Sequence, residues 1–155
     1  MLQIGKKAPS FTLLDQDGRK VRLADFAGRT VVLFAYPKAA TPGCTAQACG
    51  FRDNYAAVAA AGAVVLGVSP DPVAKLKRWR EQQNFPYDLL SDPDHAVLAA
   101  YGAWGEKQMY GKTYEGVIRS HWIIGPDGKL RDQQLKVSPK DSVARALEFL
   151  AGAGA

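Results

Sequence analysis

Two runs of consecutive apolar residues dominate the hydrophobic pattern of the chain, at residues 30–36 and 63–69. Both are rich in β-branched side chains, and unbroken runs of this length are typical of strands that are buried on both faces. Between them, residues 43–61 have the length and composition of a first long helix. A strand–helix–strand unit of this kind predicts two parallel strands joined by a right-handed connection.

Shorter strands are predicted in pairs on either side of this unit. The two pairs are residues 11–14 with residues 21–23, and residues 117–124 with residues 129–135. Each pair is separated by an Asp-Gly turn, at Gly18 and at Gly128. Turn residues between two apolar segments indicate a β-hairpin, so the sequence predicts one hairpin near each end of the chain.

Three further helices are predicted from their capping residues and prolines. They begin at Asp71-Pro72, at Ser91-Asp92-Pro93 and at Ser138-Pro139, and they end near Gln83, Tyr101 and Leu150 respectively. Residues 103–116 contain three glycines among aromatic residues and are expected to form a loop. The last five residues, 151–155, alternate Ala and Gly and are expected to form a disordered tail.

The order of these elements predicts the fold class. A chain of 155 residues fits one compact domain, which we place at residues 1–150. A hairpin, a βαβα core, a second hairpin and a final helix indicate an α/β fold. We expect a mixed central β-sheet with helices on both faces and an N-terminal β-hairpin extension.

The charge of the chain changes this picture little. A net charge of +5 and a pI of about 9.3 invite a nucleic-acid partner, but the basic residues are scattered. Their one modest cluster, at residues 75–80, fits the solvated face of a helix better. The longest uncharged stretch, residues 54–70, is shorter than the roughly 20 apolar residues of a membrane helix. We expect no nucleic acid, no membrane and, because no signal-peptide core is visible, a cytoplasmic location.

Candidate chemistry centres on the only two cysteines, Cys44 and Cys49. In a reducing cytoplasm cysteines are more often catalytic or metal-binding than structural. Cys44 follows Thr41-Pro42-Gly43, so it falls at a helix start, where unpaired N–H groups and the helix dipole favour a thiolate. Thr41 can cap this helix, and it can also turn its hydroxyl toward a substrate held above the sulfur; the two interpretations are not exclusive, and the sequence leaves both open.

The spacing of the two cysteines is poor for a disulfide bond. In an ideal helix, residues five apart have Cα atoms about 8–9 Å apart. A disulfide tolerates at most about 7 Å between Cα atoms. Cys44 and Cys49 therefore cannot bond within an intact helix, and the first helical turns must unwind if they bond at all.

Metal binding is the competing use of two thiols. Zinc usually takes four ligands, and the only histidines are His95 and His121. Neither histidine has the spacing of a ligand pair, since His95 lies at a predicted helix start and His121 within a predicted strand. We therefore expect no metal and no other cofactor.

The segment around the cysteines resembles the active-site segment of peroxiredoxins, and the second cysteine five residues on is similar to the bacterioferritin comigratory protein (PrxQ) branch. The matching segment is residues 36–49, YPKAATPGCTAQAC. The likeness continues in FRDN at residues 51–54, LSD at 90–92, YGAWGEK at 101–107, GKTYEG at 111–116 and RS at 119–120. It covers essentially the whole chain before the tail.

This resemblance implies a thioredoxin-like fold and a thiol peroxidase that reduces hydrogen peroxide and organic hydroperoxides. It implies that Cys44 is the peroxidatic cysteine and that Pro37, Thr41 and Arg119 complete its pocket. It further implies that Cys49 is the resolving cysteine, which forms an intramolecular disulfide with Cys44. The reductant implied is thioredoxin or a similar dithiol, and the implied oligomeric state is a monomer.

Two other function classes stay open on the residues alone. A general thiol–disulfide oxidoreductase would share the fold, but it would reduce disulfides and ignore peroxide. A nucleic-acid-binding module would rest on the basic pI and would show an affinity that falls steeply with salt.

Overall fold

Two parallel strands form the centre of the molecule, as the two long apolar runs predict. The computed structural model describes residues 2–153, and within them strand β3 (Thr30–Ala35) pairs in parallel with β4 (Ala63–Ser69). The register runs from Thr30 opposite Ala63 to Ala35 opposite Val68. All seven residues of β4 are buried, because both faces of the sheet are covered.

Seven strands form one mixed sheet in the order β2-β1-β5-β4-β3-β8-β9. The remaining strands of this sheet are β1 (Thr12–Leu14), β2 (Lys20–Arg22), β5 (Asp88–Ser91), β8 (Ser120–Ile124) and β9 (Leu130–Gln134). The helices are η1 (Leu23–Phe26), α1 (Pro42–Asp53), α2 (Tyr55–Ala60), α3 (Val73–Gln83), α4 (Ala96–Ala100) and α5 (Pro139–Ala153). The pairs β3–β4 and β4–β5 are parallel, and the other pairs of this sheet are antiparallel.

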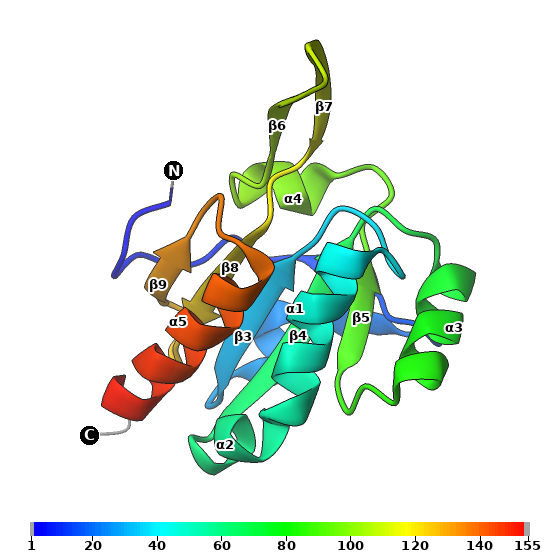
Figure 1. Cartoon of the computed structure of the whole chain (residues 1–155). Coiled ribbons are helices and arrows are strands. Elements are labelled where there is room, and N and C mark those ends of the chain that lie inside the picture. The colour runs from blue at the N-terminus through cyan, green and yellow to red at the C-terminus, as the bar shows by residue number, and fades with distance from the viewer. Residues whose placement is uncertain (1, 154–155) are drawn as a thin grey trace.

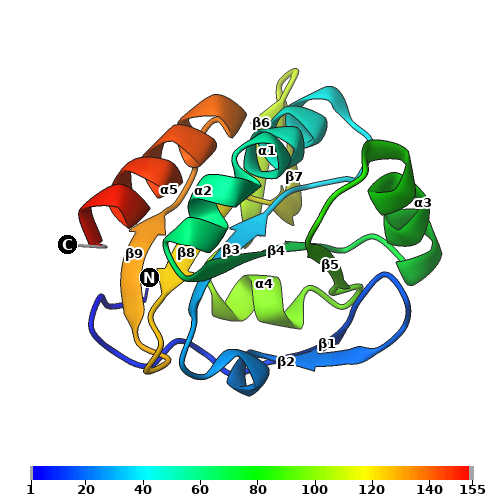
Figure 2. The ribbon, with the colours of Figure 1, turned by 90° about the horizontal axis from the view of Figure 1, so that it is seen from below.

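The helices cover both faces of this sheet, which confirms the predicted architecture (Figure 1, Figure 2). Helices α1, α2, α3 and α5 lie on one face and α4 lies on the other. Each face of the sheet has its own hydrophobic core, and alternate residues of β3 point into one or the other. Val32 and Phe34 belong to the core that contains Cys44 and Phe51 of α1. Val31 and Leu33 belong to the core that contains Leu98 of α4. The predicted N-terminal hairpin, β1–β2, extends the sheet by pairing with β5.

The segment expected to be a loop, residues 103–116, is instead a second hairpin. Strands β6 (Trp104–Met109) and β7 (Lys112–Val117) pair over their full length and project from the body of the molecule (Figure 1). The turn between them consists of Tyr110 and Gly111, both with positive φ, at 54° and 75°. Two residues with positive φ are the requirement of a tight hairpin turn. Of the three glycines that suggested a loop, Gly111 forms part of the turn. Gly105 and Gly116 lie opposite each other on the two paired strands.

Further boundaries differ from the sequence prediction, among them the helix expected from Ser91, which begins only at Ala96 because Ser91 ends strand β5. The helix expected at residues 43–61 is broken at Asn54, whose side-chain amide donates to the Gly50 carbonyl at 2.8 Å and ends α1. Strand β5 was not predicted, because four residues between a helix break and a helix cap give little pattern. The last helix runs to Ala153 rather than ending near Leu150, since alanine favours helix and one glycine does not stop it. Residues 154 and 155 of the expected tail lie outside the described residues.

Candidate active site

Cys44 lies in the first turn of α1, which follows the C-terminal end of the central strand β3. Thr41 is the N-cap of this helix, Pro42 its first residue, and the first helical hydrogen bond runs from Thr45 N to Thr41 O at 2.8 Å. The predicted placement of Cys44 at a helix start is confirmed. The residue is buried, with only 1% of its surface exposed. Its position gives it the unpaired N–H groups and the positive dipole of a helix start.

That preceding loop is held by a buried carboxylate. Oδ2 of Asp71 accepts the backbone N–H of Ala39 at 2.7 Å and the hydroxyl of Ser69 at 2.7 Å. Ala40 follows with a φ of 66°, a left-handed conformation that is unfavourable for a residue with a side chain. Asp71 thus ties the loop to the end of β4, whereas the sequence pattern predicted only that it starts a helix.

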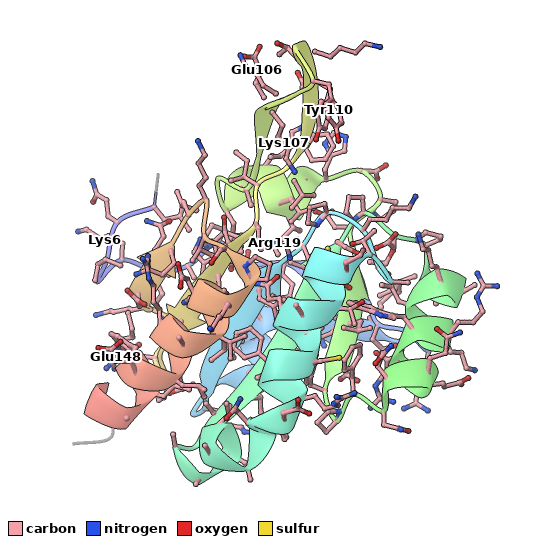
Figure 3. The ribbon with its side chains drawn as sticks, viewed as in Figure 1. Lys6, Glu106, Lys107, Tyr110, Arg119 and Glu148 are labelled. Carbon is pink, nitrogen blue, oxygen red and sulfur yellow. The ribbon has the colours of Figure 1, made fainter. Side chains whose placement is uncertain are left out.

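Arg119 brings a positive charge to the sulfur from a distant part of the chain. It lies in the two-residue link between β7 and β8 (Figure 3). Its Nη2 is 3.4 Å from Sγ of Cys44. Its backbone carbonyl accepts the N–H of Val137 at 2.9 Å, which fixes the link. A Cβ on Gly43 would lie 3.1 Å from Nη2 of Arg119, so glycine there leaves room for the guanidinium. The guanidinium therefore donates to the sulfur and places a positive charge beside it.

The hydroxyl of Thr41 does not cap α1. It donates instead to the carbonyl of Lys38 at 2.7 Å, and no side chain caps this helix start. Thr41 and Pro37 are both half-buried on the loop before Cys44. Because the hydroxyl proton is already used, the oxygen keeps its lone pairs for an incoming O–H group. Of the two interpretations of Thr41 that the sequence left open, the capping one is wrong.

A buried polar chain continues behind Arg119. Nη1 of Arg119 donates to Oε1 of Gln47 at 2.7 Å, and Nε2 of Gln47 donates to Oγ of Ser142 at 3.0 Å. Nδ1 of His121 lies 2.8 Å from the same Ser142 oxygen. Since that hydroxyl accepts from Gln47, its own proton is free to be donated to His121. Gln47, Ser142 and His121 are each fully buried, and none of the three was a candidate from the sequence.

His121 is neutral in this environment. Burial, and secondarily the positive charge of Arg145, lowers the pKa of His121 to about 4. The nearest carboxylate oxygen, Oδ2 of Asp132, is 4.0 Å from Nε2 and is too far to hold a proton there. Nε2 itself has no hydrogen-bond partner among the described residues.

Cys49 faces a different part of the molecule from Cys44. It is half-buried, and its Sγ lies 3.5 Å from Oε1 of Gln83 at the end of α3. Burial raises the pKa of the Cys49 thiol, and the neighbouring Arg52 opposes this only in part. Both thiols are free on the unbroken helix α1, as the spacing argument predicts for a reduced state.

No metal site or membrane span is found in the described part of the chain. Among residues 2–153 no three His, Cys, Asp or Glu side chains gather closely enough to hold a metal ion. The two histidines have other contacts, since His95 stacks on Trp104 with ring centroids 3.8 Å apart and His121 bonds Ser142. Nor is any helix over those residues both long and apolar enough to cross a bilayer.

Comparison with known proteins gives one consistent result. Residues 4–133 match the model of the AhpC/TSA family. The chain is 50% identical over 129 residues to Peroxiredoxin Bcp of Escherichia coli, which covers 83% of each chain. It is 42% identical over 149 residues to Peroxiredoxin Bcp of Bacillus subtilis, covering 96% of this chain and 95% of the relative. The bacterioferritin comigratory protein of Xanthomonas campestris superimposes with a TM-score of 0.91 at 30% identity, over 99% of this chain and 100% of the other.

Proposed function

The chain belongs to the AhpC/TSA family of peroxiredoxins and is a thiol peroxidase, and we propose that Cys44 is the thiol that attacks the peroxide. The observation that carries this assignment is the contact between the sulfur of Cys44 and the guanidinium of Arg119, at 3.4 Å. A nucleophilic thiol needs a neighbouring positive charge and a helix start, and Cys44 has both. Cys49 lies beyond the helix start, and burial raises the pKa of its thiol despite the neighbouring charge of Arg52.

The first step transfers one oxygen atom to sulfur. The Cys44 thiolate attacks the terminal oxygen of the hydroperoxide, the O–O bond breaks, and the leaving alkoxide or hydroxide takes up a proton. Sulfur is oxidised by two electrons to sulfenic acid, while the peroxide is reduced to an alcohol or to water. In this step Arg119 stabilises the thiolate and the charge that develops on the leaving oxygen. The lone pairs of the Thr41 hydroxyl accept the peroxide O–H, and Pro37 shields the sulfur from water.

The second step forms a disulfide within the chain. The sulfur of Cys49 attacks Sγ of Cys44, the S–O bond breaks, and the hydroxyl leaves as water after taking up a proton. The two residues are five apart on α1, and in an intact helix their Cα atoms lie about 8–9 Å apart, too far for a disulfide. The beginning of α1 therefore unwinds before the bond forms. Unwinding also removes Cys49 from the burial that raises the pKa of its thiol.

The third step returns both cysteines to thiols. As a peroxiredoxin the protein takes a peroxide substrate and a thioredoxin-type reductant. The reductant's thiolate attacks the Cys44–Cys49 disulfide, and the reductant leaves with its own disulfide after the exchange. We assign thioredoxin itself to this role. Organic hydroperoxides belong to the substrate range because the Xanthomonas campestris relative is described by its alkyl peroxide reduction activity.

The proposal extends to the state of the whole protein. Residues 1–150 form a single domain that acts as a monomer in the cytoplasm, without nucleic acid or membrane as a partner. What supports a single domain is that one sheet takes strands from both ends of the chain, since β2 and β9 are its two edges.

The experiment is peroxide consumption coupled to thioredoxin oxidation, with the Cys44→Ser variant as the comparison. We expect the variant to consume no peroxide. Full activity without the Cys44 thiol would remove the basis of the assignment. Reduction of insulin disulfides in the absence of any peroxide consumption would favour a general thiol–disulfide oxidoreductase instead.

A further inference from the structure

A cavity of about 470 Å³ lies near the beginning of β3, away from Cys44. Its floor is formed by Val31 and Ile124, which are paired on β3 and β8. Val31 is the second residue of β3, whereas Cys44 follows the end of this strand at Ala35, so about 13 Å of strand separates the cavity from the site of the thiol. A volume of several hundred Å³ is that of a site for a small organic molecule.

Backbone hydrogen bonds hold together the three segments that surround this cavity. The turn between β8 and β9 binds both of the other segments. The carbonyl of Pro126 accepts the N–H of Gly28, before β3, at 2.9 Å. The carbonyl of Gly128 accepts the N–H of Ala8, in the N-terminal segment, also at 2.9 Å. Figure 2 shows the N-terminal segment and the start of β3 beside this turn. The walls are therefore fixed before any ligand enters, which lowers the entropic cost of binding.

The interior of the cavity is apolar. Val31 and Ile124 are buried members of the hydrophobic core on the α4 face of the sheet. Leu23 and Phe26 of η1 pack against the same core, but they are only half-buried where they line the cavity. The cavity thus leaves part of this core open to water, and the apolar body of a ligand would cover it.

Two cationic side chains stand at the rim. The ammonium group of Lys7 donates to the carbonyl of Asp127 at 2.8 Å and has two further N–H donors. The guanidinium of Arg29 has no carboxylate oxygen within 4.0 Å among residues 2–153. The one carboxylate in the lining belongs to Asp127, and its Oδ1 accepts the N–H of Lys129 at 3.0 Å. A guanidinium without a carboxylate partner, beside an apolar cavity, favours a ligand that carries a carboxylate.

We propose that this cavity binds a small aromatic carboxylate. The ring lies on Val31, Ile124 and Phe26, where it covers apolar surface and meets another aromatic side chain. The carboxylate lies at the rim, where Arg29 and Lys7 donate to it. The ligand is bound and released unchanged, so this site acts independently of the thiol chemistry of Cys44. The inference therefore goes beyond the proposed function and does not rest on it.

The test titrates the reduced, isotope-labelled protein with cinnamate and, separately, with the neutral cinnamyl alcohol. Backbone amide chemical shifts locate the bound molecule. We expect saturable shifts at Gly28, Gly125 and Gly128, which surround the cavity, and none at residues 43–50 of α1. The dissociation constant should be about tenfold lower for cinnamate than for the alcohol, because only cinnamate makes charge-assisted hydrogen bonds. Added salt should reduce this difference.

Two variants test the role of the guanidinium. Arg29→Met keeps an apolar side chain at the rim but removes the charge, so the dissociation constants of cinnamate and the alcohol should become nearly equal. Arg78→Met removes an exposed arginine from α3 and is the matched control, which should keep the difference unchanged.

Several results would overturn the inference. Equal dissociation constants in the unmodified protein at low salt would contradict a carboxylate site, and so would a preference for cinnamate that survives Arg29→Met. Shifts centred on residues 43–50, or a loss of peroxide consumption when cinnamate is added, would place the ligand at Cys44 instead. Sedimentation of the ligand-free protein tests a rival occupant, since a dimer that blocks the shifts at Gly28 and Gly125 would assign the cavity to an interface between two copies.

Peroxide consumption without cinnamate separates this inference from the proposed function. A protein that consumes peroxide but binds both compounds equally contradicts only the carboxylate site. A protein that binds cinnamate at the cavity but consumes no peroxide contradicts only the assignment of Cys44.

Discussion

Nη2 of Arg119 lies 3.4 Å from Sγ of Cys44, although the two residues are 75 positions apart in the chain. Their contact joins the start of α1 to the link between β7 and β8, and it places a permanent positive charge beside a buried sulfur. Since a thiolate is the reactive form of cysteine, we expect the rate of the proposed first step to depend on this contact.

Removing the charge of Arg119 tests that dependence directly. We expect Arg119→Met to slow the oxidation of Cys44 by hydrogen peroxide about 100-fold, the usual cost of losing one group that stabilises developing charge. Arg119→Lys keeps the charge but cannot contact Gln47 and Cys44 together. Its oxidation rate should therefore lie between those of the unmodified protein and Arg119→Met. Stopped-flow tryptophan fluorescence measures this rate. Arg78→Met, at an exposed position of α3, is the control and should react normally; an equal loss there would speak against a specific role of Arg119.

Gln47 orients the guanidinium that contacts the sulfur. Its Oε1 accepts from Nη1 of Arg119 at 2.7 Å, so Gln47→Ala should lower the oxidation rate of Cys44 about tenfold by freeing the arginine. Gln47→Glu keeps an acceptor toward Arg119 and should retain most of the rate. Thermal unfolding of both variants is measured alongside. If both variants lose rate in proportion to lost stability, Gln47 has a structural role and does not position Arg119.

His121 makes the stability of the fold sensitive to acid. Its pKa is about 4 in the folded protein, against about 6.5 in an unfolded chain. Between these values the unfolded chain binds a proton that the folded protein does not, so stability falls as the pH falls from about 6.5 to about 4. The contribution lost is about 3 kcal/mol.

Urea unfolding at pH 7 and pH 4.5 measures this loss. His121→Thr replaces the imidazole by a neutral side chain that suits a strand. We expect this variant to lose distinctly less stability between the two pH values than the unmodified protein. The same pH dependence in both proteins would show that the titration of His121 is not the cause.

Disulfide formation should unwind the beginning of α1. Hydrogen exchange of the backbone amides compares the reduced and the oxidised protein. We expect residues 43–50 to lose protection on oxidation, because the helix spacing of Cys44 and Cys49 is too long for the bond. The backbone amides of α5 should keep their protection from exchange, and they serve as an internal control. A disulfide-bonded protein with unchanged protection at residues 43–50 would disprove the need for unwinding.

How far the sequence predicts this protein depends on the distance over which each interaction acts. The apolar runs of β3 and β4 and the Asp-Gly turns are local patterns, and the structure confirms them. The start of α1 at Thr41-Pro42-Gly43 is equally local and places Cys44 correctly. The β6–β7 hairpin was missed because Tyr110, a residue with a side chain, adopts positive φ in its turn.

The polar contacts of the site join residues far apart in the chain, and no local sequence pattern predicts them. The contact of Arg119 with Cys44 was expected from family resemblance alone. The bond from Gln47 to Ser142 joins residues 95 positions apart, and the bond from Ala39 to Asp71 joins two loops. Only the folded sheet brings these residues together, so Gln47, Ser142 and Asp71 could not be singled out beforehand.

The most direct test of the account is to locate the first oxidised sulfur. The unmodified protein and the Cys49→Ser variant are each treated with one equivalent of hydrogen peroxide in the presence of dimedone, and their peptides are examined by mass spectrometry. We predict an intramolecular Cys44–Cys49 disulfide in the unmodified protein and a dimedone adduct on Cys44 in the variant, formed at an unchanged initial rate. Loss of peroxide reactivity in Cys49→Ser, together with a dimedone adduct on Cys49 in Cys44→Ser, would contradict the assignment of the two cysteines.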